Sequence, residues 1–331
     1  SGGIRDMTTY LGLDLGGTNV KAAAVRSQDG VHKIVETMTV PSEAHAGPDS
    51  VTGVMIDVAR TMIEEVGAVR AVGIGVPGLF DFASGEIVFF TNLPGEWEGF
   101  PLRSKIATGL DLPATLITDA RAFTLAEATV GAGAGCRNVA CVTLGTGVGG
   151  GLYINGELHF GAFGIGGELG HQTVAPGGPM CGCGNPGCME ALARPPAVAD
   201  RAGKRSFEEV IEGAARREPR AERAFDEAVE YLGIGLANIV TVIGPERIVI
   251  GGGGADAGEA VIGPIRDSVR SRVTLVPPDQ IEVVPAILGS TAGAVGAAIA
   301  AIESPSKDAK FLAGEIPSAT KRRQASFKLN E

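Results

Sequence analysis

A carboxylate at a predicted strand-to-helix junction is the first candidate for chemistry in this sequence. An apolar run ends at Thr118, Asp119 follows, and a helical pattern through Leu125 begins. Ligands of α/β sheets bind at such junctions, and the partial positive charge of a helix N-terminus favours an ionised carboxylate. We predict that Asp119 accepts a proton from a substrate hydroxyl. The alternative interpretation is an N-cap aspartate that only starts the helix.

A glycine turn near the start of the chain is a candidate anion site. It joins two apolar runs and contains Gly16, Gly17 and Thr18, with Asp14 just before it. No helix follows the glycines, which excludes a P-loop or a dinucleotide fingerprint. Backbone N–H groups and a hydroxyl at such a turn can bind phosphate, and Asp14 could hold Mg²⁺ through water. An ordinary hairpin turn is the alternative.

A second glycine turn repeats this arrangement. Gly145, Thr146 and Gly147 follow an apolar strand and match the spacing G-x-G-x-x-G literally, but another strand with an Asn155–Gly156 turn comes next. We therefore interpret it as a second phosphate-facing hairpin and the pair as an internal duplication. Later in the chain, Gly251–Gly254 follows a buried strand, and bare backbone at Gly252 and Gly253 suits a flat group such as adenine.

One histidine and three cysteines give the four soft ligands of a closed tetrahedral zinc site: His171, Cys181, Cys183 and Cys188. With no open position for water, the zinc would be structural rather than catalytic. Glu168 and Glu190 flank the cluster, and a rigid metal site would hold both carboxylates where they can accept hydrogen bonds from hydroxyls. A loop with Asn92 and the only tryptophan, Trp97, suits a sugar ring or is simply a packed turn.

Composition narrows the class of protein. The chain has 331 residues, of which 44 % are hydrophobic and 20 % charged, which is typical of a globular protein. A net charge of −10 without a dense basic stretch argues against nucleic acid as a partner, including a zinc-ribbon nucleic-acid binder. We find no apolar run of membrane-spanning length and no secretory leader, and five cysteines do not form an even disulfide framework. A cytoplasmic protein is expected.

Taken together, these motifs resemble the ROK family (repressors, open reading frames, kinases) of the hexokinase, actin and Hsp70 superfamily, from about Leu11 to Ile302. The resemblance implies an α/β fold of two actin-like ATPase (ribonuclease H-like) lobes, with ATP and Mg²⁺ as cofactors and a homodimer or a dimer of dimers. It also implies that Asp119 is the catalytic base and that Glu168, His171 and Glu190 bind sugar. We place the small lobe at 8–119, completed by a helix at 290–303. The large lobe covers 120–289 with the zinc knuckle at 171–188, and a polar tail covers 304–331.

The expected reaction is transfer of the ATP γ-phosphoryl group to a hexose hydroxyl, first of all the 6-OH of glucose. Two positions depart from the family pattern, since Thr118 and Arg121 stand where its kinases usually carry Asn. An amino sugar, an N-acetylhexosamine, fructose or a modified sugar therefore stay open as substrates, and so does polyphosphate as the donor. A sugar-sensing protein without catalysis is the other class. The family's repressors carry a DNA-binding domain before the first hairpin, and the few residues before Asp14 here favour the enzyme.

Overall fold

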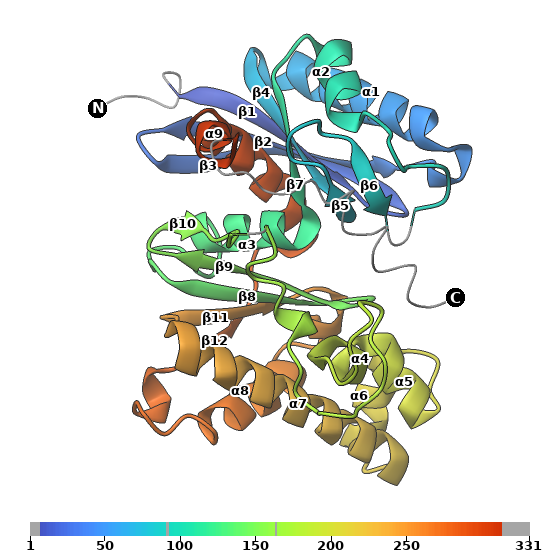
Figure 1. The fold of residues 1–331 in the computed structure, drawn as a ribbon, viewed down its shortest axis with the longest axis vertical. Coiled ribbons are helices and arrows are strands. Elements are labelled where there is room, and N and C mark those ends of the chain that lie inside the picture. Colours follow the sequence, from blue (N-terminus) through green and yellow to red (C-terminus); the bar gives the residue numbers. More distant parts are fainter. Residues whose placement is uncertain (1–6, 91–92, 163, 313–331) are drawn as a thin grey trace. The chain divides into compact units, whose positions relative to one another are not determined.

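The computed structural model describes residues 7–90, 93–162 and 164–312 (Figure 1). They form two compact units. The first unit contains the chain up to Ala126, Ala162 and Gly164, and the chain from Ser290 onward. The second unit contains Glu127–Gly161 and Ile165–Gly289. No helix among the described residues is both long and apolar enough to cross a membrane.

The first unit is built on a five-stranded mixed sheet in the order β3-β2-β1-β4-β7. The first three strands are antiparallel neighbours, whereas β4 and β7 run parallel to β1. The strands are β1 (Thr8–Leu15), β2 (Asn19–Gln28), β3 (Val31–Pro41), β4 (Val69–Val76) and β7 (Ala114–Thr118), and a small hairpin consists of β5 (Gly78–Phe80) and β6 (Ile87–Phe90). The helices are α1 (Pro48–Val66), α2 (Leu102–Leu110), α3 (Asp119–Thr129), which begins where β7 ends, and α9 (Ala292–Leu312).

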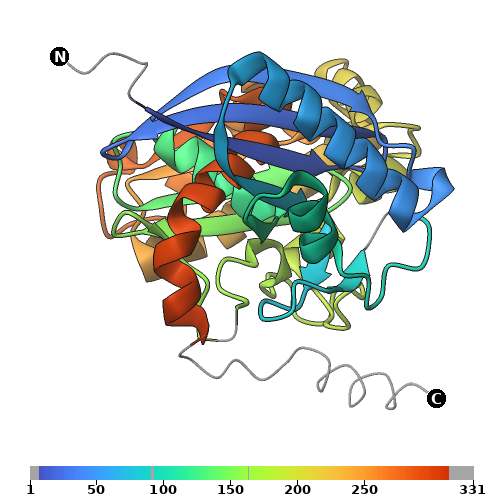
Figure 2. The same cartoon turned by 90° about the horizontal axis from the view of Figure 1, so that it is seen from above.

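Successive residues of a strand point to opposite faces of a sheet, and here α1 covers one face and α9 the other. The odd-numbered leucines of β1, Leu11, Leu13 and Leu15, are buried in the same core as the apolar stripe of α1. The even-numbered Gly12 lies against α9, where a Cβ would overlap the carbonyl oxygen of Ala294. Figures 1 and 2 show the two helices on opposite faces of the sheet. Gly12 therefore lets α9 approach the backbone of β1 closely.

The second unit repeats the same sheet plan. Its strand order is β10-β9-β8-β11-β12, with an antiparallel hairpin at β8–β9 and with β11 and β12 parallel to β8. The strands are β8 (Val139–Leu144), β9 (Val148–Ile154), β10 (Glu157–Leu158), β11 (Arg247–Gly251) and β12 (Glu282–Pro285). The helices are α4 (Met189–Ala193), α5 (Pro195–Ala202), α6 (Phe207–Ala215), α7 (Pro219–Ile243) and α8 (Glu259–Arg270). The shared order of antiparallel and parallel pairings agrees with an internal duplication.

Two details of the predicted organisation differ from the structure. The units divide inside α3, between Ala126 and Glu127, rather than after Asp119. The start of α3 packs on α9, where a Cβ at Gly296 would overlap the carbonyl oxygen of Ala122, whereas Glu127 bonds to backbone of the second unit. Helix α9 also continues to Leu312, into the segment predicted as a tail, and 313–331 lies outside the described residues.

Candidate functional site

In the first unit, the carboxylate of Asp14 lies in a space that two glycines leave open. Asp14 is near the end of β1, and its Oδ1 would be 3.1 Å from a Cβ at Gly75 on the neighbouring strand. A Cβ at Gly293, in the first turn of α9, would lie 2.5 Å from Oδ2. The carboxylate therefore faces the N-terminus of α9, where the helix dipole favours negative charge. Larger residues at Gly75 or Gly293 would fill this space.

The surroundings of Asp14 disfavour the ionised form of its carboxyl group. Burial, and then the negative charge of Asp119, raise the pKa of Asp14 from 3.8 to about 6, and Lys21 partly opposes this rise. Lys21 is the direct partner of Asp14 across the β1–β2 pair. A half-buried carboxylate near a second carboxylate suits a divalent cation, since an ion such as Mg²⁺ prefers carboxylate and water oxygens. The two acidic groups thus form one coupled site.

Asp119 is the first residue of α3, as predicted, and it is exposed. Its Oδ1 accepts a hydrogen bond from the N–H of Ala120 at 2.7 Å. Of its neighbours, Thr118 is 9 % exposed and Arg121 3 % exposed, and the Arg121 guanidinium donates through Nη2 to the carbonyl oxygen of Gly164. The sequence did not indicate this burial of a cation.

The first glycine turn is held by a residue that the sequence did not single out. The N–H of Gly16 donates to the carbonyl oxygen of Asn19 at 2.9 Å and closes the turn. Ser42 donates its hydroxyl to the carbonyl oxygen of Gly17 at 3.1 Å and its N–H to that of Thr18 at 2.9 Å. Gly17 and Thr18 are exposed. The turn is thus fixed from one side and open on the other, and no local pattern links it to Ser42.

The second glycine turn is fixed by a carboxylate. Gly145 donates its N–H to the carbonyl oxygen of Gly147 at 2.9 Å. Glu190 accepts the N–H of Val148 at 3.0 Å through Oε2, and a Cβ at Gly147 would overlap that oxygen. Glycine at 147 is therefore needed for Glu190 to reach the turn. Thr146, at the tip, is exposed.

The glycine tract after β11 lies next to this second turn. Gly252 has a φ of 83° and packs on the backbone of Leu144, the residue before Gly145. Gly254 packs on Leu144 and Pro195, whereas a Cβ at Gly253 would meet nothing within 4 Å. The second unit therefore brings together the predicted phosphate turn and an exposed stretch of bare backbone.

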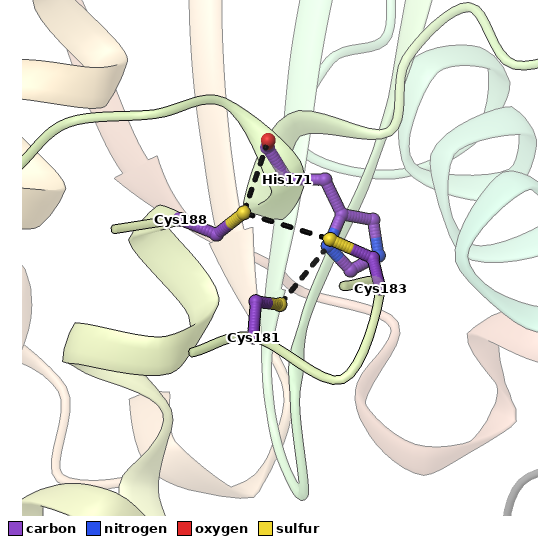
Figure 3. A group of neighbouring side chains, drawn as sticks. All are labelled: His171, Cys181, Cys183 and Cys188. Atoms are coloured by element: carbon purple, nitrogen blue, oxygen red, sulfur yellow. Dashed lines mark hydrogen bonds between the residues drawn. The ribbon is translucent and has the colours of Figure 1, made fainter. Parts of the chain in front are cut away.

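The predicted metal ligands also come together in the second unit (Figure 3). The ligand atoms of His171, Cys181, Cys183 and Cys188 all lie within 4.8 Å of one another. Burial raises the pKa of the Cys181 thiol to about 12 and also raises that of Cys188. A metal ion reverses this effect, because a coordinated thiol loses its proton. Three cysteines and one histidine fit a closed zinc site.

The cluster is continuous with Glu190. Cys181 lies 3.5 Å from Glu190 Oε1, and His171 Nδ1 lies 4.0 Å from the same oxygen. His171 belongs to a short 3₁₀ turn, Leu169–His171, whose N-cap is the exposed Glu168. Asn92 lies outside the described residues. Trp97 is 3 % exposed and packs on Phe90 and Phe100, so the packed-turn interpretation of Trp97 holds.

Each unit thus carries a glycine hairpin at the same place in its sheet, together with acidic residues at strand ends or beside the hairpin. This duplicated arrangement defines the actin-like ATPase class. The ROK family profile matches residues 10–304, and the chain belongs to the ROK family.

Proteins of similar sequence support this assignment. The chain is 35 % identical to a glucokinase of Thermotoga maritima over 309 residues, or 87 % of this chain and 95 % of that one. It is 31 % identical to a xylose repressor of Bacillus subtilis, over 75 % of this chain and 66 % of the repressor.

Two solved structures are similar as well. A ROK hexokinase of Thermus thermophilus has 34 % identity and a TM-score of 0.79, covering 91 % of this chain and all of the other. A ROK glucokinase of Streptomyces griseus, solved with glucose and AMPPNP, has 32 % identity and a TM-score of 0.70, covering 89 % of this chain and 99 % of the other.

Proposed function

We propose that this protein is an ATP-dependent sugar kinase that transfers the γ-phosphoryl group to a hexose hydroxyl, with the 6-OH of glucose as the first candidate. The observation that carries the proposal is the pair of carboxylates in the first unit, with Asp14 near the end of β1 and Asp119 at the start of α3. Their chemistry suits a kinase, which needs one acid near the metal and one near the attacking hydroxyl. The similarity to glucokinases along nearly their whole length supports it.

In this mechanism Asp119 orients the sugar hydroxyl and takes its proton as the hydroxyl oxygen attacks the γ-phosphorus. Such a general base contributes about 10²–10⁴ in rate. Asp14 would hold Mg²⁺ through water, and a bound Mg²⁺ neutralises charge on the phosphates. The exposed N–H groups and the hydroxyls of Thr18 and Thr146 would bind phosphate oxygens. Bare backbone at Gly252 and Gly253 would lie against the adenine.

For the sugar, we propose that Glu168 and His171 bind hydroxyls, and that Asn92 contributes from its loop. Glu190 would bind the sugar and also hold the phosphate turn, because its Oε2 accepts the N–H of Val148 in that turn. A structural Zn²⁺ held by the Cys and His ligands would fix His171 and Glu190 beside that turn. One side chain would thus position both the sugar and the turn that binds phosphate. We also propose a homodimer or a dimer of dimers.

The choice of sugar depends on positions 118 and 121. Arg121 is buried and bonded to the carbonyl oxygen of Gly164, and Thr118 offers a hydroxyl where an Asn would offer a side-chain amide. A site built to bond a particular hydroxyl discriminates by roughly 10⁴–10⁵. Amino sugars, N-acetylhexosamines and fructose therefore belong beside glucose in the first assay. The similarity to a xylose repressor keeps a sugar-sensing protein as the second candidate.

The test is a coupled ADP-release assay with ATP across hexoses, amino sugars and polyols, repeated with polyphosphate as the donor. We expect one sugar to give turnover and Asp119→Ala to lower kcat by at least about 10², with sugar binding still measurable by calorimetry. Near-normal turnover of Asp119→Ala would remove Asp119 from the mechanism. If the wild-type protein releases ADP with none of the sugars but a sugar still shifts its melting temperature, the result would favour a sugar-sensing protein without catalysis.

A further inference from the structure

A cavity on the helical side of the second unit lies outside all residues assigned above. Its volume is about 500 Å³, and it is lined by Arg201, Pro219, Arg220, Arg223, Ala224 and Glu227. We call it the arginine pocket. Arg201 comes from the last turn of α5, and the other residues come from the first turns of α7. Arg220, Arg223 and Glu227 share one face of α7, because residues three, four or seven apart lie on the same side of a helix.

The arginine pocket has an excess of positive charge. Its three guanidinium groups face one carboxylate, that of Glu227, whose Oε2 lies 3.6 Å from Arg201 Nε. Among the described residues, no carboxylate oxygen lies within 4.0 Å of a guanidinium nitrogen of Arg220 or Arg223. Cations elsewhere in this region do have acidic partners, for example Arg205 with Glu209 and Lys204 with Glu218. A local excess of about two positive charges is notable in a chain of net charge −10.

Arg201 has donors that the protein does not satisfy. Its Nε and Nη2 are buried and have no hydrogen-bond partner. The 3.6 Å separation from Glu227 is too long for a hydrogen bond. Desolvation lowers the pKa of Arg201, so a negative charge beside the guanidinium group would stabilise its charged form.

The start of α7 adds to this preference for anions. Its N-cap, Glu218, makes no side-chain capping bond. The Glu218 carboxylate instead accepts hydrogen bonds from Lys204 and Arg216. The first N–H groups of α7 are thus left without a side-chain cap, and the positive end of the helix dipole points toward the pocket wall at Pro219.

We propose that the arginine pocket binds the phosphate group of a small phosphate monoester. Planar guanidinium groups match phosphate oxygens with paired hydrogen bonds. A monoester dianion carries about −1.5 to −2 charges near pH 7, which balances the excess of the pocket. The volume leaves room for a small organic group beyond the phosphate. Such a ligand would contact Arg201 and the first turns of α7, which take no part in the proposed reaction, and would thus be an effector rather than a substrate.

The test uses the full chain with glycerol 3-phosphate as the monoester, against glycerol and against sodium chloride at matched ionic strength. Hydrogen–deuterium exchange locates the effect, and calorimetry gives the affinity. We expect slower exchange in peptides from 195–230 and no change in those from 139–154. The double variant Arg220→Gln/Arg223→Gln should raise the Kd at least about tenfold, since each loses a charged hydrogen bond. Arg205→Gln is the matched control, because its side chain is 91 % exposed and outside the pocket.

Three results would overturn the proposal. The first is an effect no larger than that of sodium chloride. The second is equal affinity in wild type and in the double variant. The third is protection confined to 139–154, which would place the phosphate at the nucleotide hairpin instead. Because Arg220 and Arg223 are exposed helix positions, the double variant should fold, and an unchanged circular dichroism spectrum and melting temperature check this.

Discussion

The buried carboxylate of Glu127 gives the sharpest stability prediction. Glu127 is 0 % exposed. Its Oε1 accepts the N–H groups of Leu288 at 2.9 Å and Ile287 at 3.1 Å, and its Oε2 accepts that of Ala132 at 2.8 Å. A Cβ at Gly131 would overlap Oε2, so glycine there lets the carboxylate reach its donors. The carboxylate thus ties α3 to the segment that leads out of the second unit.

The perturbation is Glu127→Gln, which keeps the shape and replaces one acceptor oxygen by an NH₂ group. That group must face at least one of the backbone N–H groups, and leaving a buried donor unsatisfied costs about 1–3 kcal/mol. The remaining hydrogen bonds also lose their charge, which is worth roughly another 1 kcal/mol. We therefore expect the free energy of unfolding of the second unit to fall by about 2–4 kcal/mol.

The assay is urea unfolding followed by circular dichroism, with Glu246→Gln as the matched control. Glu246 also accepts two backbone N–H groups, from Arg137 at 2.6 Å and Asn138 at 2.7 Å, but it is exposed. Water can replace these bonds, so its loss should stay below about 1 kcal/mol. If both variants lose the same amount, or if Glu127→Gln loses less than about 1 kcal/mol, burial of the acceptor does not control the cost and our reasoning is wrong.

Three further predictions concern the two carboxylates Asp14 and Asp119, the cluster of cysteines with His171, and the packing of α9 on the sheet of the first unit. In protein without Mg²⁺, NMR should give Asp14 a titration midpoint near pH 6, and Asp119→Asn should lower it by removing the neighbouring charge; a wild-type midpoint of 3.8 would contradict this. Because the folded pKa is the higher one, Asp14 contributes less stability as the pH rises from 3.8 through about 6. Cys183→Ser should lower bound zinc by elemental analysis, whereas Cys136→Ser should retain it; equal metal content would exclude the cluster as the site. Gly73→Ala should cost at least about 1–3 kcal/mol in urea unfolding, because a Cβ there overlaps the carbonyl oxygen of Ala297. Gly53→Ala, in open space on α1, should instead stabilise by about 0.5–1 kcal/mol, and a similar loss in both would argue against close packing as the cause.

Features that depend on neighbouring residues were predictable from the sequence. The two hairpins follow from apolar runs interrupted by glycines, and β1–β2 and β8–β9 have the predicted pairing. The strand-to-helix junction at Asp119 follows from a change of hydrophobic period. The spacing of the cysteines was also sufficient to group them with His171. In each case one short segment contains most of the information.

Features that depend on contacts between distant segments were not predictable. The hydrogen bonds of Glu127 to Ile287 and Leu288 join residues about 160 positions apart, and nothing near Glu127 indicates a buried carboxylate. The same applies to Ser42 at the first hairpin and to the burial of Arg121. A charged or hydroxyl side chain is by default expected at the surface, and only the fold shows what it contacts. Asn92 and 313–331 lie outside the described residues.

The position of α9 at the end of the chain has a consequence for synthesis in the cell. The sheet of the first unit is complete once Thr118 has been made, but the helix that covers Gly12 and Gly73 begins only at Ala292. On the ribosome, the first unit therefore waits for the whole second unit to be translated before one face of its sheet is covered. The exposed face makes the nascent first unit a candidate for chaperone binding during this interval. The second unit, whose sheet and helices come from 127–161 and 165–289, depends on no later segment and can fold first.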